Sequence, residues 1–140
     1  MTKVTFYDTS KISDDILKFA VITARYDNKW ILCRHKERST WEIPGGHREP
    51  DENILDTAKR ELYEETGATE FELKTVCIYG VTKDDVTTYG LLCFAEVKTL
   101  DSLSPETEIG EIGLFDILPE NLTYPTIQPS LFEKVINIDL

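Results

Sequence analysis

The chain has 140 residues, 41% of them hydrophobic, and a formal net charge of −11 at pH 7. This length fits one compact domain that can bury a core of its own. The negative charge argues against binding to duplex DNA, which needs a basic surface, and no apolar run approaches the ~20 residues that cross a membrane. Three widely spaced cysteines without a Cys-x-x-Cys pair predict reduced thiols, and with them a cytoplasmic location.

The first predicted elements form a hairpin. Residues 18–26 and 29–35 are rich in β-branched and aromatic residues, which predicts two strands, and the Asp-Asn dipeptide between them suits a tight turn. An extended segment over residues 39–43 follows. It ends at a Pro-Gly-Gly break, where glycine allows the backbone to take an unusual path.

A helix is predicted next, from near residue 51 to residue 66, with Gly67 as its C-terminal stop. Three further strands and a closing helix are predicted after it, over residues 71–79, 87–97, 109–115 and 126–138. Because strands outnumber helices and the helices are dispersed among them, this order predicts an α/β sandwich with a mixed β-sheet.

The first predicted helix carries three carboxylates on one side. At about 100° per residue, Glu61, Glu64 and Glu65 fall within an arc of roughly 100°, beside the apolar stripe that includes Leu62. Like charges at these spacings repel one another, and the helix dipole disfavours them near the C-terminus. A bound divalent cation reverses both effects, and carboxylate oxygens favour magnesium or manganese. Taken alone, the helix also fits an ordinary solvated acidic face. The neighbouring residues are therefore needed to distinguish a metal site from such a face.

The neighbouring residues complete a longer pattern: Gly46, five residues, Glu52, seven residues, and then R-E-L-Y-E-E-T-G-A over residues 60–68. This pattern resembles the Nudix box, G-x5-E-x7-R-E-U-x-E-E-x-G-U, in which U is a bulky aliphatic residue. Every Gly, Glu and Arg of the box is present, and only Ala68 is small for its position. The Trp-Glu-x-Pro-Gly-Gly lead-in is similar to that of the MutT-like branch. The resemblance implies a single Nudix hydrolase domain over residues 1–140, with the box at 46–68 and an α/β/α sandwich fold.

The resemblance also implies a metal site, with Mg²⁺ as the cofactor and Mn²⁺ as the alternative. The ligands are expected at five positions: Glu61, Glu64, Glu65, Glu52 and Gly45. Of these, Glu52 resembles a weaker or water-mediated ligand, and Gly45 belongs to the loop that approaches the metals. Arg60 resembles the residue that orients the glutamates by ion pairing.

The chemistry of phosphoanhydrides then suggests a mechanism. Divalent ions neutralise the phosphate oxygens and lower the pKa of an attacking water, and one carboxylate takes the proton of that water as general base. Glu64 or Glu61 is the candidate within the box. In several family members a glutamate in the loop before a late strand assists; Glu108 occupies a comparable place, with Glu111 as the alternative. The expected catalytic residues are Glu61, Glu64, Arg60 and Glu108.

Residues outside the box supply candidates for substrate binding. Arg34 and Arg38 follow a strand and are expected to bind phosphates, although a solvated loop fits them too. Glu42 is expected to accept a hydrogen bond from a base or to hold the loop. His35 and His47 are expected to be polar surface residues rather than metal ligands. Four aromatic residues are candidates for stacking on a nucleobase: Trp41, Phe6, Tyr79 and Tyr89.

The resemblance implies hydrolysis of a nucleoside diphosphate linked to another group. The MutT-like lead-in favours a nucleoside triphosphate pyrophosphohydrolase, with oxidised dGTP among its substrates, that yields the monophosphate and pyrophosphate. Removal of pyrophosphate from the 5′ end of RNA and cleavage of ADP-ribose are the alternatives within the enzyme class. A catalytically silent nucleotide-sensing module is the alternative outside it, but such modules often lose box glutamates and this box has lost none. Family members are often dimers, so a homodimer is the expected assembly.

Overall fold

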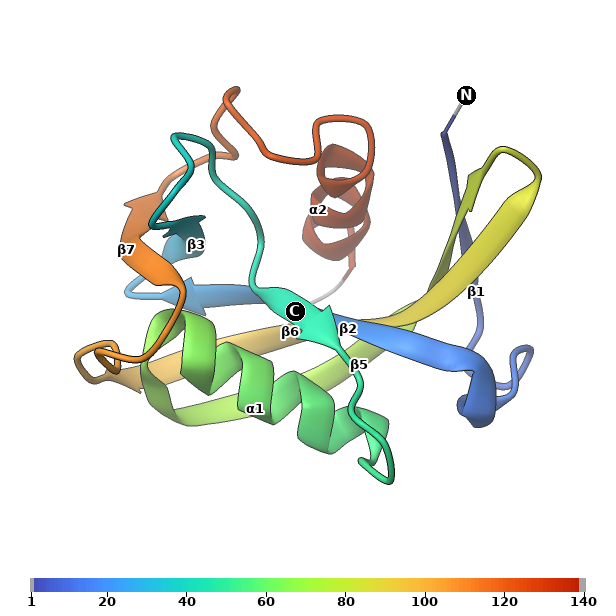
Figure 1. Cartoon of the computed structure of the whole chain (residues 1–140), viewed down its shortest axis with the longest axis horizontal. Helices are drawn as coiled ribbons and strands as arrows, with labels where there is room; N and C mark the ends of the chain where they lie inside the picture. The colour runs from blue at the N-terminus through green and yellow to red at the C-terminus, as the bar shows by residue number, and fades with distance from the viewer. Residues whose placement is uncertain (1, 139–140) are drawn as a thin grey trace.

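The computed structural model describes residues 2–138, and within them a seven-stranded sheet lies between two helices (Figure 1). The strand order is β1-β5-β6-β2-β3-β7, with β4 paired to β2 beside this path. The elements are β1 (Lys3–Tyr7), β2 (Leu17–Tyr26), β3 (Lys29–His35), β4 (Gly45–His47), α1 (Ile54–Thr66), β5 (Ala68–Lys83), β6 (Val86–Leu100), β7 (Ile109–Phe115) and α2 (Gln128–Ile136). Because β2 and β6 are parallel and the other pairs are antiparallel, the predicted mixed sheet is confirmed.

The core lies in two layers, one on each face of the sheet. Successive residues of a strand point to opposite faces, and in β2 Ala20 and Ile22 pack in the cluster that includes Leu62 of α1. Val21 of the same strand packs in the other cluster, which includes Leu131 of α2. The two helices therefore cover opposite faces of the sheet, as Figure 1 shows, and the predicted α/β/α sandwich is confirmed.

The predicted turns and helix ends match the structure closely. Asp27 and Asn28 have φ values of 52° and 62°, as a tight hairpin turn of the primed type requires. Helix α1 begins at Ile54, three residues later than predicted, because the Asn53 side chain caps it by accepting a hydrogen bond from the Leu55 N–H. Gly67 ends the helix in the left-handed conformation, with φ at 81°.

The sheet extends further than the sequence indicated. Strands β5 and β6 continue well beyond the predicted ends and meet in a turn at Asp84 and Asp85, both with positive φ. Strand β1 was not predicted; it is a short, half-buried edge strand on β5. The segment over residues 39–43 forms only isolated bridges, and the following glycines instead form β4 against β2.

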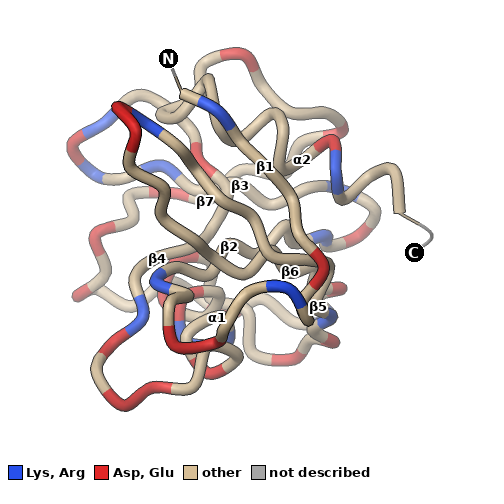
Figure 2. Tube along the Cα trace, turned by 90° about the vertical axis from the view of Figure 1, so that its right-hand side faces the viewer, with Lys and Arg blue, Asp and Glu red and all other residues tan. Residues whose placement is uncertain are grey.

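Charge and thiols complete the description of the surface and interior. Lysine and arginine are interspersed among acidic residues along the trace (Figure 2). The three cysteines are free and buried. Within residues 2–138, no helix is long and apolar enough to span a membrane.

Candidate active site

A cavity of about 620 Å³ lies between β4, the C-terminal half of α1, the α2-facing side of the sheet and α2 itself. Its lining combines acidic and apolar side chains. The acidic ones are Glu42, Glu61, Glu65 and Glu108. The apolar ones are Phe19, Val21, Tyr79, Val81, Ile127 and Leu131. The volume is within the ~300–1,000 Å³ of small-molecule sites.

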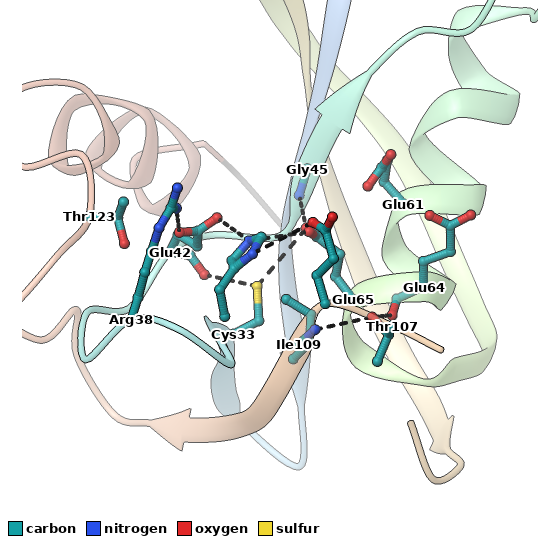
Figure 3. A network of polar contacts seen from close by, with 12 residues as sticks. Cys33, Arg38, Glu42, Gly45, Glu61, Glu64, Glu65, Thr107, Ile109 and Thr123 are labelled. Atoms are coloured by element: carbon teal, nitrogen blue, oxygen red, sulfur yellow. Dashed lines mark hydrogen bonds and ion pairs between the residues drawn. The ribbon is translucent and has the colours of Figure 1, made fainter. Parts of the chain in front are cut away.

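The carboxylates of α1 differ in their surroundings. Glu61 and Glu65 are largely buried against β4, with side-chain exposures of 12%, whereas Glu64 is 48% exposed. The Gly45 N–H donates a hydrogen bond of 2.8 Å to Glu65 Oε1. In Figure 3, Glu61 and Glu65 lie on the side of α1 that faces Gly45, whereas Glu64 lies over the helix itself. The helix thus places two of its three acids inside the cavity wall.

The two glycines of β4 are needed for this approach. A Cβ on Gly46 would lie 2.5 Å from the carboxyl carbon of Glu61, so any side chain there would displace that carboxylate. A Cβ on Gly45 would lie 2.5 Å from the backbone oxygen of Ala20, so glycine allows β4 to pair with β2. Glycine at position 46 of the box therefore leaves the space that the Glu61 carboxylate occupies.

Arg60 donates hydrogen bonds to three glutamates of the box, Glu52, Glu61 and Glu64. Its Nε and Nη2 donate to the two oxygens of Glu52 at 2.7 and 3.0 Å. Its Nη1 donates to Glu61 at 2.8 Å and to Glu64 at 3.3 Å. Its Nη2 also donates to the His47 carbonyl at 3.0 Å. These contacts are the ones that an orienting role requires.

Glu52 is occupied by this arginine in the structure. Hydrogen bonds from Arg60 and then Thr57 lower the pKa of Glu52 to about 2, and both of its oxygens accept from Arg60. Glu52 thus orients Arg60, and within residues 2–138 its Oε2 accepts a hydrogen bond only from Arg60 Nε. Its expected role as a weaker or water-mediated metal ligand stays a prediction.

The protein compensates the ionised forms of the buried carboxylates only in part. Burial raises the pKa of Glu65 to about 8, and the Gly45 N–H offsets this only partly. Burial also raises the pKa of Glu61, against the opposing effect of Arg60. Burying a carboxylate without a full counter-charge destabilises the fold, so these groups fit a hard divalent cation chemically. Within residues 2–138, however, no three His, Cys, Asp or Glu side chains already form a closed ligand cluster.

The end of β3 places His35 inside the site, which corrects its expected position as a surface residue. Its side chain is 20% exposed, and its Nε2 lies 3.0 Å from Glu42 Oε1 and 3.9 Å from Glu65 Oε2. Its Nδ1 lies 3.8 Å from Glu108 Oε2. One feature of the sequence could have predicted this position. Residues i and i+2 of a strand share a face, so His35 is expected on the same face as the buried Cys33.

The two arginines expected to bind phosphates lie in different places. Arg34 pairs with Glu111 of β7 at 2.9 Å and donates to the carbonyls of residues 35 and 38. Its charge is therefore directed away from the acidic side chains of the cavity. Glu111, the alternative base, is occupied by the same pair. Arg38 does line the cavity, and it donates to Glu42 Oε2 at 3.1 Å.

Glu42 and Glu108 also border the cavity, each from a segment outside α1. Glu42 is buried, and its two oxygens are taken up by His35 and Arg38, so it holds the loop rather than presenting a free acceptor. Glu108 is 86% exposed at its side chain. Its backbone oxygen accepts a hydrogen bond of 2.9 Å from the Lys36 N–H. The structure thus brings Glu108 to the site that the sequence expected.

Only one of the four expected stacking residues lines the cavity, namely Tyr79. The other three pack elsewhere, Trp41 on Phe115, Phe6 under Lys134 and Tyr89 on Tyr7. Sequence reasoning missed Phe19, Tyr124 and Gln128, which also line it. Gln128 is 6% exposed and accepts from the Ile43 N–H, and its amide nitrogen forms no hydrogen bond within residues 2–138.

The site fits a phosphoanhydride hydrolase, because it combines the glutamates of α1, the contacts of Arg60 with them and the adjoining cavity. Comparison with known proteins agrees. The family model of the NUDIX domain matches residues 17–126. The chain belongs to the Nudix family. It is an enzyme that hydrolyses phosphoanhydride bonds.

Several relatives bear on the type of substrate. A Bacillus subtilis (strain 168) protein, provisionally named 8-oxo-dGTP diphosphatase YtkD, is 34% identical over 117 residues, 84% of this chain and 73% of that protein. The crystal structure of the Bacillus subtilis pyrophosphohydrolase BsRppH, an E68A mutant, has a TM-score of 0.80 at 27% identity, covering 96% of this chain and 90% of that one. An RNA pyrophosphohydrolase of Bartonella henselae is 41% identical over 46 residues, 31% of this chain and 27% of that protein.

Proposed function

We propose that this enzyme is a Mg²⁺- or Mn²⁺-dependent pyrophosphohydrolase of nucleoside triphosphates, with oxidised dGTP among its substrates, that releases the monophosphate and pyrophosphate. The observation that carries the proposal is the cavity itself, whose lining combines buried carboxylates with apolar side chains and Gln128. The similarity to the provisionally named 8-oxo-dGTP diphosphatase supports it. A cytoplasmic location is also our proposal, supported by three free cysteines.

The proposed metal ligands are Glu61, Glu64 and Glu65. The Ile22 N–H donates to the Pro44 oxygen, so the backbone groups of Gly45 point away from β2, and the carbonyl of Gly45 joins the ligands. When bound, the cation neutralises phosphate charge and lowers the pKa of a water. Arg60 holds Glu61 and Glu64 in place, and the Gly45 N–H orients Glu65.

Glu108 is our proposed acceptor of the proton from the attacking water. A general base needs a carboxylate that reaches the water and is not already neutralised. Glu61 is bonded to Arg60 at 2.8 Å and Glu65 to the Gly45 N–H, whereas Glu108 borders the cavity on an exposed loop. Glu64, which Arg60 contacts at a longer 3.3 Å, is the alternative base within the box.

The remaining lining residues suit the rest of a nucleotide. Arg38 and His35, both held by Glu42, are our proposed contacts for the phosphate chain. Tyr124 lines the same cavity, is 44% exposed and offers a face for stacking. The free amide nitrogen of Gln128 offers a donor to an acceptor on the base edge.

A specific observation favours a second candidate, the removal of pyrophosphate from the 5′ end of RNA. A neighbouring cavity of about 500 Å³ shares His35, Arg38 and Glu108 with the first and is lined further by residues 36, 37 and 107. It offers room beside the phosphate end for a second nucleotide. The similarity to the RNA pyrophosphohydrolase of Bartonella henselae supports this candidate.

A substrate panel with Mg²⁺ distinguishes these functions. We expect dGTP and 8-oxo-dGTP to give the monophosphate and pyrophosphate with a higher kcat/KM than ADP-ribose, dinucleoside polyphosphates or triphosphorylated RNA. A higher kcat/KM on triphosphorylated RNA would replace the first candidate by the second. Tight binding of one compound without cleavage of any would contradict both.

We expect Gly46→Ala to lower turnover about 10- to 100-fold, because the new Cβ displaces the Glu61 carboxylate by steric overlap at 2.5 Å. Gly80→Ala is the matched control, since the three atoms nearest to its Cβ are side-chain atoms of Tyr7, Thr87 and Tyr89 at 3.1–3.3 Å. Steady-state kinetics on the preferred triphosphate, with circular dichroism of both variants, gives the comparison. Equal turnover in both variants would contradict the role of Gly46.

A further inference from the structure

Thr107 connects the glutamate helix to the loop that carries Glu108 (Figure 3). Its hydroxyl donates a hydrogen bond of 3.0 Å to the backbone oxygen of Glu64 and accepts one of 3.3 Å from the Ile109 N–H. We infer that Thr107 is a positioning residue that fixes Glu108 relative to the metal-binding end of α1. This inference rests on the proposed role of Glu108 as proton acceptor.

The bond is made at a helix carbonyl that the helix itself leaves open. The last carbonyls of an α-helix have no partner within the helix. The Gly67 N–H bonds to the oxygen of Tyr63, and the Ala68 N–H bonds to the Thr66 hydroxyl. The Ala68 N–H, which is the regular i+4 donor to the Glu64 oxygen, therefore bonds elsewhere. The Thr107 hydroxyl, from a loop distant in sequence, donates to the Glu64 oxygen instead.

The same loop is fixed on its other side by backbone bonds. Glu108 accepts from the Lys36 N–H at 2.9 Å, beyond the end of β3. At the start of the loop, the Asp101 N–H donates to the Gly67 oxygen at 2.8 Å. Between these points residues 104–106 are exposed. Thr107 therefore supplies the side-chain bond that ties the Glu108 end of the loop to α1.

The side-chain attachment of the Glu108 loop to α1 thus depends on one hydroxyl group. The Glu108 carboxylate is 86% exposed, and its nearest ionic partner, His35, is 3.8 Å away, so its own contacts hold it weakly. A shift of about 1 Å in a reacting group can cost on the order of 100-fold in rate. Because the Glu108 backbone keeps its bond to Lys36, we expect a smaller loss when only the hydroxyl is removed.

The test compares Thr107→Val, which keeps the shape and loses the hydroxyl, with Thr107→Ser, which keeps the hydroxyl. We expect valine to lower kcat about tenfold with KM changed less than twofold, and serine to restore most of kcat. Thr99→Val is the matched control, because the Thr99 hydroxyl makes a comparable bond to Glu70 away from the site. We expect it to leave kcat unchanged.

A double-mutant cycle with Glu108→Gln separates positioning of Glu108 from simple capping of α1. We expect Thr107→Val to have no further effect on kcat once Glu108 is already glutamine. The same tenfold loss in both backgrounds would overturn the inference, and so would wild-type kcat in Thr107→Val. Wild-type kcat in Glu108→Gln would instead remove Glu108 from the proposed mechanism, and the role of Thr107 with it.

Discussion

Replacing Glu64 with glutamine is expected to lower turnover by about 10²–10⁴-fold, the range for loss of a group that acts directly in catalysis. The glutamine keeps the size of the side chain but removes the negative charge that a divalent cation requires. Because Glu64 is 48% exposed and touches only Arg60 at 3.3 Å among its side-chain contacts within residues 2–138, the fold should tolerate the change.

The measurement is the steady-state rate of pyrophosphate or phosphate release at saturating Mg²⁺, with thermal unfolding as the check on folding. Asp56→Asn is the matched control, since it removes a carboxylate from an exposed position near the start of the same helix. We expect Asp56→Asn to keep wild-type turnover. If Glu64→Gln also keeps it, Glu64 is neither a ligand nor a base.

Replacing Glu65 with glutamine is expected to have opposite effects on activity and on metal-free stability. Turnover should fall on the order of 10²–10³-fold, because a proposed metal ligand that would contribute several kcal/mol of charge stabilisation is lost. The amide oxygen of glutamine can still accept the bond from the Gly45 N–H. The metal-free variant should nevertheless be more stable than the wild type at alkaline pH.

The sign of the stability effect follows from the pKa. Burial raises the pKa of Glu65 from 4.5 to about 8 in the folded protein, so folding favours its protonated form. The contribution of this carboxyl to stability is fully present below pH 4.5 and is lost as the pH rises through about 8. Thermal unfolding in EDTA from pH 5 to 9 should show this loss in the wild type and a smaller one in Glu65→Gln. Identical pH profiles would contradict the burial argument.

Short sequence patterns correctly predicted the turns and helix ends, because these features depend on residues that are close in the sequence. The spacing in the box, Gly67 and the Asp-Asn turn each act within a few residues, and the structure has them where expected. Strand β1 was missed because it is five residues long, half-buried, and paired with β5 more than 70 positions later. The true ends of β5 and β6 depend on cross-strand pairing of polar residues, which an apolar pattern does not mark.

The site was predictable on α1 and much less so elsewhere. Glu61, Glu64 and Glu65 share one helix, so their spacing alone brings them together. Arg34 was expected to bind phosphate, but the register of β3 with β7 sets it opposite Glu111. Residues such as Tyr124 and Gln128 reach the cavity only when α2 and its preceding loop pack on the sheet, which no local pattern specifies.

The most direct test of the central claim is the Mg²⁺ dependence of hydrolysis by the wild-type enzyme and Glu64→Gln. The preferred nucleoside triphosphate is incubated with enzyme in EDTA and then with increasing Mg²⁺, and pyrophosphate release is followed. We predict no release in EDTA, saturable activation of the wild type by Mg²⁺, and little activation of Glu64→Gln at any concentration. Full hydrolysis in EDTA, or equal activation of both proteins, would contradict a metal-dependent site on α1.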